Sequence, residues 1–199
     1  MNHDLNGKRV AILVADGFEQ DELVKPREAL DEAGAETAVV SPCEKKVKGR
    51  KHDKPGRSVR VDLPLNEADP TDFDALLLPG GVQNPDTLRM NENAVRFVKS
   101  FFDDHKPVAA ICHGPWTLVE ADVVRGRRLT SYASIKTDLR NAGANWVDEE
   151  VVVDNGLVTS RKPDDIPAFN EKMLEEFAEG RHPGQGEEGG VATGAMSMG

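Results

Sequence analysis

The sequence has little cysteine and no long hydrophobic run. Its two cysteines, Cys43 and Cys112, are too few to build a disulfide framework in a chain of 199 residues. No apolar stretch approaches the ~18 residues that a bilayer-spanning helix needs. No apolar segment precedes residue 9, as it would in a secretory signal. These absences predict a cytoplasmic protein whose thiols are reduced.

The chain also lacks an excess of basic charge. The chain has 25 Lys and Arg residues against 35 Asp and Glu residues, which gives a formal net charge of -10. Binding to a nucleic-acid backbone or to an anionic membrane needs a basic surface, so neither partner is expected. The five histidines include no H-x-x-x-H pair, and the cysteine spacing matches no zinc pattern. The sequence therefore predicts neither a metal site nor a cofactor.

Short apolar runs alternate with amphipathic stretches of helical period along most of the chain. The runs, of the kind buried on both faces of a parallel sheet, lie at residues 10–14, 37–40, 75–78 and 107–111. The main helices are expected at 19–33, 84–90, 92–104, 116–123, 135–142 and 167–179, with hairpins within 41–64 and 151–159 and a short strand at 129–132. This order predicts an α/β fold: a doubly wound, mostly parallel sheet of flavodoxin-like type with helices on both faces. We expect one domain over residues 1–179 and a disordered, glycine-rich tail over 180–199.

Cys112 stands where the run at 107–111 gives way to a helix. The small residues Ala110 and Gly114 flank it, as a sharp strand–nucleophile–helix turn requires. The sulfur at such an elbow lies at a helix N-terminus, which favours the thiolate and predicts a lowered pKa for Cys112. Cys43 lies in a loop with no such context. The alternative for Cys112 is an inert thiol buried at a strand end.

Other residues with chemical potential gather at neighbouring strand ends, where ligands bind in sheets of this type. The backbone N–H groups of Gly80, Gly81 and His113 are candidates for an oxyanion hole. The His113 side chain is either a general base or a capping imidazole, and the sequence leaves this open. Glu19 either shares a proton with the Cys112 thiolate or is an ordinary acid at a helix start.

Five segments of the chain, in order, resemble the PfpI family, which belongs to the superfamily with the class I glutamine amidotransferase-like fold. The segments are residues 15–23 (ADGFEQDEL), 78–81 (LPGG), 85–89 (PDTLR), 108–116 (VAAICHGPW) and 159–167 (TSRKPDDIP). The resemblance spans roughly residues 8–179. It excludes a true glutamine amidotransferase, because that activity needs a later His-x-Glu and the only later histidine is His182, in the tail.

The resemblance also implies roles for particular residues. Cys112 matches the nucleophile, and His113 matches its adjacent histidine. Glu19 matches a glutamate that is protonated and hydrogen-bonded to the sulfur. Asp86 of a neighbouring subunit matches an acid that orients the histidine, which implies a homodimer or a hexamer built from dimers. The positions near the pocket are Trp116 and Tyr132.

The family resemblance implies a cysteine-dependent hydrolase or lyase of the stress response. We expect deglycase or glyoxalase action on methylglyoxal, glyoxal or their protein adducts, because a thiolate attacks a carbonyl in this chemistry. One alternative is an intracellular cysteine peptidase of the PfpI type, acting on peptides. The other is a non-enzymatic stress protein that senses oxidation through Cys112 or holds unfolded chains.

Overall fold

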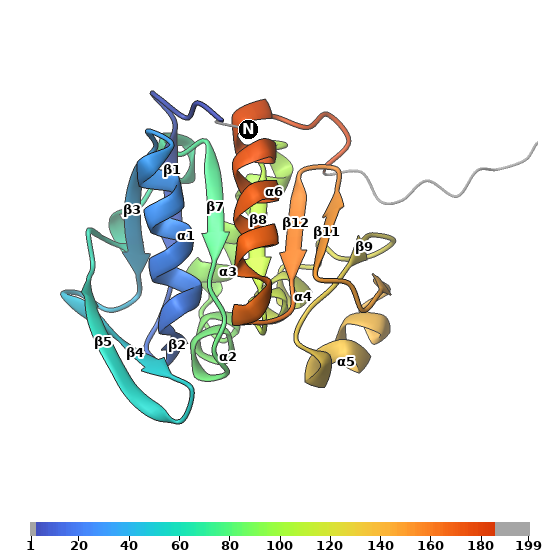
Figure 1. Ribbon diagram of the computed structural model, residues 1–199, viewed down its shortest axis with the longest axis horizontal. Helices are drawn as coiled ribbons and strands as arrows, with labels where there is room; N and C mark the ends of the chain where they lie inside the picture. The colour runs from blue at the N-terminus through green and yellow to red at the C-terminus, as the bar shows by residue number, and fades with distance from the viewer. Residues whose placement is uncertain (1–2, 186–199) are drawn as a thin grey trace, which may run out of the picture.

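A seven-stranded sheet forms the centre of the computed structural model, which describes residues 3–185 (Figure 1). Its strands run in the order β11-β12-β8-β7-β1-β3-β6, and all are parallel to their neighbours except β11. Their bounds are β1 (Arg9–Leu13), β3 (Glu36–Ser41), β6 (Leu63–Pro64), β7 (Ala75–Leu78), β8 (Val108–Ile111), β11 (Val151–Asp154) and β12 (Leu157–Ser160). The predicted doubly wound, mostly parallel α/β fold is confirmed.

Helices cover both faces of this sheet (Figure 1). One face carries α1 (Gln20–Glu32) and α6 (Ile166–Glu179), and the other carries α2 (Gln83–Arg89), α3 (Glu92–Asp103), α4 (Pro115–Glu120) and α5 (Lys136–Asn141). Successive strand residues therefore belong to different cores: Leu76 packs with α3, while Leu77 packs on the side of α1 and α6. Burial on both sides explains why the strands read as unbroken apolar runs.

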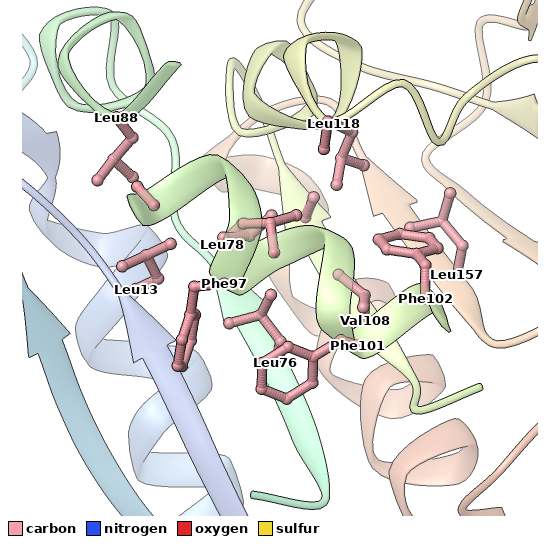
Figure 2. Packing of buried hydrophobic residues seen from close by; sticks show 14 of the residues in the cluster. Leu13, Leu76, Leu78, Leu88, Phe97, Phe101, Phe102, Val108, Leu118 and Leu157 are labelled. Atoms are coloured by element: carbon pink, nitrogen blue, oxygen red, sulfur yellow. The ribbon is translucent and has the colours of Figure 1, made fainter. Parts of the chain in front are cut away.

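The α3 side of the core is rich in aromatic rings (Figure 2). The rings of Phe97 and Phe101 meet edge-on with centroids 5.3 Å apart, and Phe97 meets Phe73 in the same way at 6.2 Å. The Asn91 side chain caps the helix by accepting from the backbone N–H of Asn93, 3.0 Å away. Burying each such ring stabilises the fold by about 1.5–3 kcal/mol. This layer therefore contributes much of the free energy that holds α3 on the sheet.

Smaller elements surround the main sheet. The hairpin expected within 41–64 is confirmed as β4 (Lys46–Lys51) and β5 (Lys54–Arg60), and β2 (Phe18–Glu19) pairs with its β4 edge. The strand expected at 129–132 is shorter, because only β9 (Arg128–Leu129) forms, and it pairs in parallel with β10 (Asn145–Trp146). The 3-10 helices are η1 (Leu65–Glu67), η2 (Pro70–Asp72), η3 (Ala133–Ile135) and η4 (Pro163–Asp165). None of the helices within residues 3–185 is long and apolar enough to cross a membrane.

The expectation of disorder from residue 180 onward is wrong for residues 180–185. The His182 backbone N–H donates to the carbonyl of His105 at 2.8 Å, and Gln185 is buried. The Arg127 guanidinium donates to the Gln185 carbonyl. These polar anchors order a segment whose composition offers little apolar surface. The rest of the predicted tail, residues 186–199, lies outside the described residues.

Candidate active site

The carboxyl ends of β1, β7 and β8 meet at one edge of the sheet and open into a cavity of about 590 Å³. The predicted site residues Cys112, His113, Gly81 and Asp86 line it, and so does Glu22. The other lining residues are Gly17, Glu19, Arg50, His52, Asp53, Val82, Gln83, Tyr132 and Pro163. The site thus lies where a parallel sheet places its ligands.

Cys112 forms a sharp turn between β8 and α4. Its φ angle is 64°, in the left-handed region that residues with a side chain rarely adopt. Hydrogen bonds fix the turn on both sides: the Cys112 N–H donates to the Ser160 carbonyl at 3.0 Å, and the Tyr132 N–H donates to the Cys112 carbonyl at 2.8 Å. A Cβ at Gly114 would lie 2.7 Å from the carbonyl oxygen of Leu78. Glycine at 114 therefore lets the backbone close under the nucleophile.

The glutamate beside the sulfur is Glu22, and the assignment of this position to Glu19 is wrong. Glu22 is fully buried, its Oε2 accepts from the Gly80 N–H at 3.0 Å, and its carboxyl group interacts with the Cys112 thiol. Glu19 lies on β2, where its Oε2 accepts from the backbone N–H of His52 at 3.0 Å. The physical reason is where α1 begins. The helix starts at Gln20, so Glu19 stays on β2 and Glu22 lies on the buried face of the helix.

A sequence signal for Glu22 exists. Glu22 shares the buried face of α1 with Leu23, Pro26 and Leu30. Because positions four apart lie on one side of a helix, Glu22, Pro26 and Leu30 form a continuous stripe. An acid in an apolar stripe is costly unless it is neutral or paired. That cost marks Glu22 as the functional carboxyl, whereas the place of Glu19 at the end of the first strand and the family resemblance pointed to Glu19.

Burial controls the pKa values of Glu22 and Cys112. Desolvation raises the pKa of Glu22 from its ordinary 4.5 to about 8, and the nearby Glu19 charge adds to this. Burial also raises the pKa of the Cys112 thiol above its usual range, as does the Glu22 carboxylate, while the N–H groups of Gly81 and His113 lower it. The expected low thiol pKa is therefore not found, since desolvation outweighs the helix N-terminus. When Glu22 carries the proton, its repulsion of the thiolate disappears, so the two groups titrate as one coupled pair.

Two of the three predicted oxyanion donors lie near the nucleophile. The backbone N–H groups of Gly81 and His113 lower the pKa of the Cys112 thiol. The Gly80 N–H does not, because it donates to Glu22. Gly81 has a φ of 78°, and a Cβ there would lie 2.4 Å from the carbonyl oxygen of Gly17. Only glycine brings this N–H to the site.

The His113 ring lies between the nucleophile and a serine. Its Nδ1 is 3.2 Å from the Cys112 sulfur, and its Nε2 is 3.0 Å from the hydroxyl of Ser134. Its burial lowers the pKa of His113, which favours the neutral imidazole. Ser134 was not predicted: it follows His113 by 21 residues, lies on η3, and belongs to no motif.

The remaining predicted residues occupy different places. Tyr132 lines the cavity and stacks on the His113 ring with centroids 4.8 Å apart. Trp116 does not line the cavity; it packs edge-on to His113 at 5.7 Å, and its indole N–H donates to Asp138 at 2.7 Å. Asp86 reaches the cavity from α2 of the same chain.

Comparison with known proteins places this geometry in a family. The sequence profile of the DJ-1/PfpI family matches residues 8–176. "Deglycase TK1284" of Thermococcus kodakarensis is 48% identical over 166 residues, which are 83% of this chain and 97% of that protein. "Putative cysteine protease YraA" of Bacillus subtilis is 46% identical over 168 residues, covering 84% and 96% of the two chains. "General stress protein 18" of the same organism is 47% identical over 170 residues, covering 84% and 96%.

A solved structure agrees with these sequence matches. A two-domain protein of Anabaena variabilis, with DJ-1/ThiJ/PfpI-like and ferritin-like domains, superposes with a TM-score of 0.79 at 41% identity, covering 84% of this chain and 47% of that one. The elbow at Cys112, its neighbouring histidine and the doubly wound sheet thus occur in a chain that belongs to the DJ-1/PfpI family.

Proposed function

We propose that this chain is a cysteine-dependent enzyme of the stress response that acts on reactive carbonyls, methylglyoxal and glyoxal or their adducts with proteins, in the deglycase or glyoxalase manner. The observation that carries the proposal is the buried pair of Cys112 and Glu22, in which a carboxyl group with a pKa of about 8 touches the nucleophile. A group with that pKa gives and takes protons readily near neutral pH. The deglycase name of a relative at 48% identity supports the same chemistry.

The reaction begins when Cys112 passes its thiol proton to the Glu22 carboxylate and the resulting thiolate attacks the aldehyde carbon of methylglyoxal. The oxygen anion that forms accepts from the N–H groups of Gly81 and His113 and takes a proton, which gives a hemithioacetal. For an amine adduct, the thiolate replaces the amine at the same carbon, and the amine leaves with the proton that Glu22 has taken from the thiol.

Glu22 then carries a proton between the two adjacent carbons. It removes the proton from the hemithioacetal carbon and returns one to the neighbouring carbon, so the first carbon is oxidised to a thioester and the ketone is reduced to an alcohol. Water hydrolyses the thioester to lactate and frees the thiol. The oxidation and the reduction balance within the substrate, so this route needs no external redox cofactor.

A peptidase of the PfpI type is the second candidate. The 3.2 Å contact between Cys112 and His113 and the name of one relative support it. A peptidase needs its histidine as an acid that protonates the leaving amine. Because burial lowers the pKa of His113, the ring is a weaker base toward the thiol proton, and little of it is protonated at neutral pH to serve the leaving amine. This argument favours carbonyl chemistry, in which Glu22 moves the proton.

The proposal includes an assembly in which Asp86 of a neighbouring subunit approaches His113, in a homodimer or a hexamer built from dimers. Val82 and Met90, at the two ends of α2, are exposed apolar side chains near Asp86 and would suit such a contact. Both ring nitrogens of His113 already have neighbours in the chain, so the incoming acid would join the Ser134 hydroxyl at Nε2. We place this enzyme in the cytoplasm, where thiols stay reduced.

Steady-state turnover of methylglyoxal and of a labelled peptide, measured side by side, tests the proposal. We expect lactate formation that is lost in Cys112→Ser and Glu22→Gln and kept in the matched control Cys43→Ser. Peptide turnover without lactate would favour the peptidase. Absence of both activities, with Cys112 oxidised selectively by peroxide, would favour a redox-sensing protein.

A further inference from the structure

Three side chains at the C-terminal end of α6 form a cluster that lies apart from the active site. Glu176, Glu179 and His182 each offer one ligand atom, and these atoms all lie within 4.8 Å of one another. Glu179 and His182 follow the part of the chain that matches the DJ-1/PfpI family, which ends at residue 176. The cluster therefore includes residues that the family comparison does not explain.

The spacing of the ligand atoms suits a small divalent cation. The Nε2 atom of His182 is 3.4 Å from Oε2 of Glu176. Two ligands bound at about 2.0–2.1 Å to a tetrahedral zinc ion are roughly 3.3 Å apart. Glu176 and Glu179 are one helical turn apart and share a face of α6. Closing the cluster around an ion requires only small side-chain movements.

One of these ligand atoms is buried without a hydrogen-bond partner among the described residues. Nε2 of His182 is shielded from solvent and has no hydrogen-bond partner among the described residues, although it faces the Glu176 carboxylate. Only a tenth of the Glu176 side chain is exposed. A buried polar atom without a partner costs about 1–3 kcal/mol. A cation between the two groups would satisfy the imidazole nitrogen and neutralise the carboxylate.

The backbone holds His182 in place independently of any ion. Its N–H donates to the His105 carbonyl at 2.8 Å, and its own carbonyl accepts from the Gln185 N–H at 3.0 Å. The imidazole packs on Gly156, where a Cβ would lie 2.8 Å from the ring atom Cδ2. The ring is thus positioned before a ligand arrives, which lowers the entropy cost of binding.

We propose that Glu176, Glu179 and His182 bind one divalent transition-metal ion of the Zn²⁺ class. One imidazole nitrogen and two carboxylate oxygens are a ligand set that zinc accepts. Glu179 is exposed, so the ion has an entry path and water can complete its coordination. Bound metal would link residues 180–185 to α6, because Glu176 and Glu179 belong to the helix and His182 belongs to the segment that follows it. A site of this spacing contains neither an H-x-x-x-H pair nor a cysteine motif, so the sequence patterns of common zinc sites do not reveal it.

Zn²⁺ titration of the full-length chain by calorimetry tests this proposal. The titration is done in a Cys112→Ser background, because the active-site thiol can itself bind zinc. We expect one ion per chain, an affinity at least about tenfold weaker after His182→Gln or Glu179→Gln, and a Zn²⁺-dependent rise in melting temperature that both variants lose. The matched control is Glu171→Gln, an exposed acid on the same helix, which should bind as the Cys112→Ser parent does.

Co²⁺ provides a spectroscopic readout on the same proteins. We expect visible absorption bands of a bound ion in the Cys112→Ser parent and their loss in His182→Gln. Absence of zinc binding in that parent would overturn the proposal and leave an ordinary ion pair between His182 and Glu176. Equal binding in His182→Gln and the parent would overturn it too, by placing the ion elsewhere.

Discussion

Cys112 and His113, neighbours in the chain, bring their side chains together, with the sulfur 3.2 Å from Nδ1 of the ring. Consecutive residues in regular structure point apart, and the left-handed φ of 64° at Cys112 accompanies this unusual contact. The Glu22 carboxyl group also interacts with Cys112. The nucleophile therefore has a buried acid and a neutral imidazole as neighbours, and the two can be tested separately.

The first prediction concerns the thiol. Replacing Glu22 with Gln removes a carboxylate that raises the pKa of Cys112, so the thiolate should form at lower pH than in the parent protein. Ultraviolet absorbance of the thiolate across a pH titration measures this, with Cys112→Ser as the blank. Glu19→Gln is the matched control and should shift the titration much less. An equal shift in both variants would contradict the assignment of Glu22.

The second prediction is a pH dependence of stability. The pKa of Glu22 is about 8 in the folded chain against an ordinary 4.5. Between those values the folded state holds a proton that the unfolded state has lost. The contribution of Glu22 is therefore fully present below pH 4.5 and is lost as the pH rises toward 8. Relative to Glu22→Gln, the parent should lose up to about 1.4 kcal/mol of unfolding free energy per pH unit in this window.

Urea denaturation of both proteins at several pH values from 5 to 8 gives this difference. Both carry Cys112→Ser, which removes the coupled thiol, so that the titrating groups away from Glu22 cancel in the comparison. Parallel pH curves for the two proteins would show that Glu22 has an ordinary pKa.

Ser134 is the subject of the third prediction. Its hydroxyl holds Nε2 of His113 at 3.0 Å, so Ser134 is a positioning residue if the ring takes part in turnover. Ser134→Ala should lower kcat by roughly two- to tenfold, the worth of one neutral hydrogen bond, with little change in KM. Ser134→Thr retains a hydroxyl and should recover most of the rate. Because Ser134 is exposed, melting temperature should barely move in either variant. A loss of stability that matches the loss of rate would indicate a structural role alone.

The fourth prediction tests the shared site. Cys112→Ser and Asp86→Ala should each be inactive, and mixing them should restore activity after subunit exchange. In a statistical mixture of dimers with two-fold symmetry, intact sites reach about a quarter of the parent number. Isotope-labelled subunits and mass spectrometry verify that exchange has occurred. If exchange is complete and no activity returns, Asp86 does not act across an interface.

The fifth prediction concerns residues 180–185. A chain that ends at Glu179 should be less stable than one that ends at Gln185, by about 1–3 kcal/mol, because buried Arg127 loses the Gln185 carbonyl. Urea midpoints of the two truncated chains, both measured with a chelator present, isolate this segment. Identical midpoints would mean that residues 180–185 add nothing to the domain.

The elements that could be predicted from the sequence are those that local chemistry decides. The apolar run at 75–78 coincides with β7, and the glycine at 114 marks the elbow after β8, because burial on both faces and close backbone approach leave clear residue preferences. Ser134 could not be predicted, since only the packing of η3 against the site brings it to His113. The choice between Glu19 and Glu22 depended on where α1 begins, a boundary that a sequence pattern fixes poorly.

The left-handed backbone conformation at Cys112 lowers the stability of the fold while it presents the nucleophile. A residue with a Cβ in the left-handed region costs about 1–2 kcal/mol, and glycine does not bear this cost. Cys112→Gly should therefore be more stable than Cys112→Ala by about 1 kcal/mol, the reverse of the usual order for these two residues in regular structure. On stability alone this position would favour glycine, so a cysteine here gives up folding free energy in exchange for a reactive sulfur.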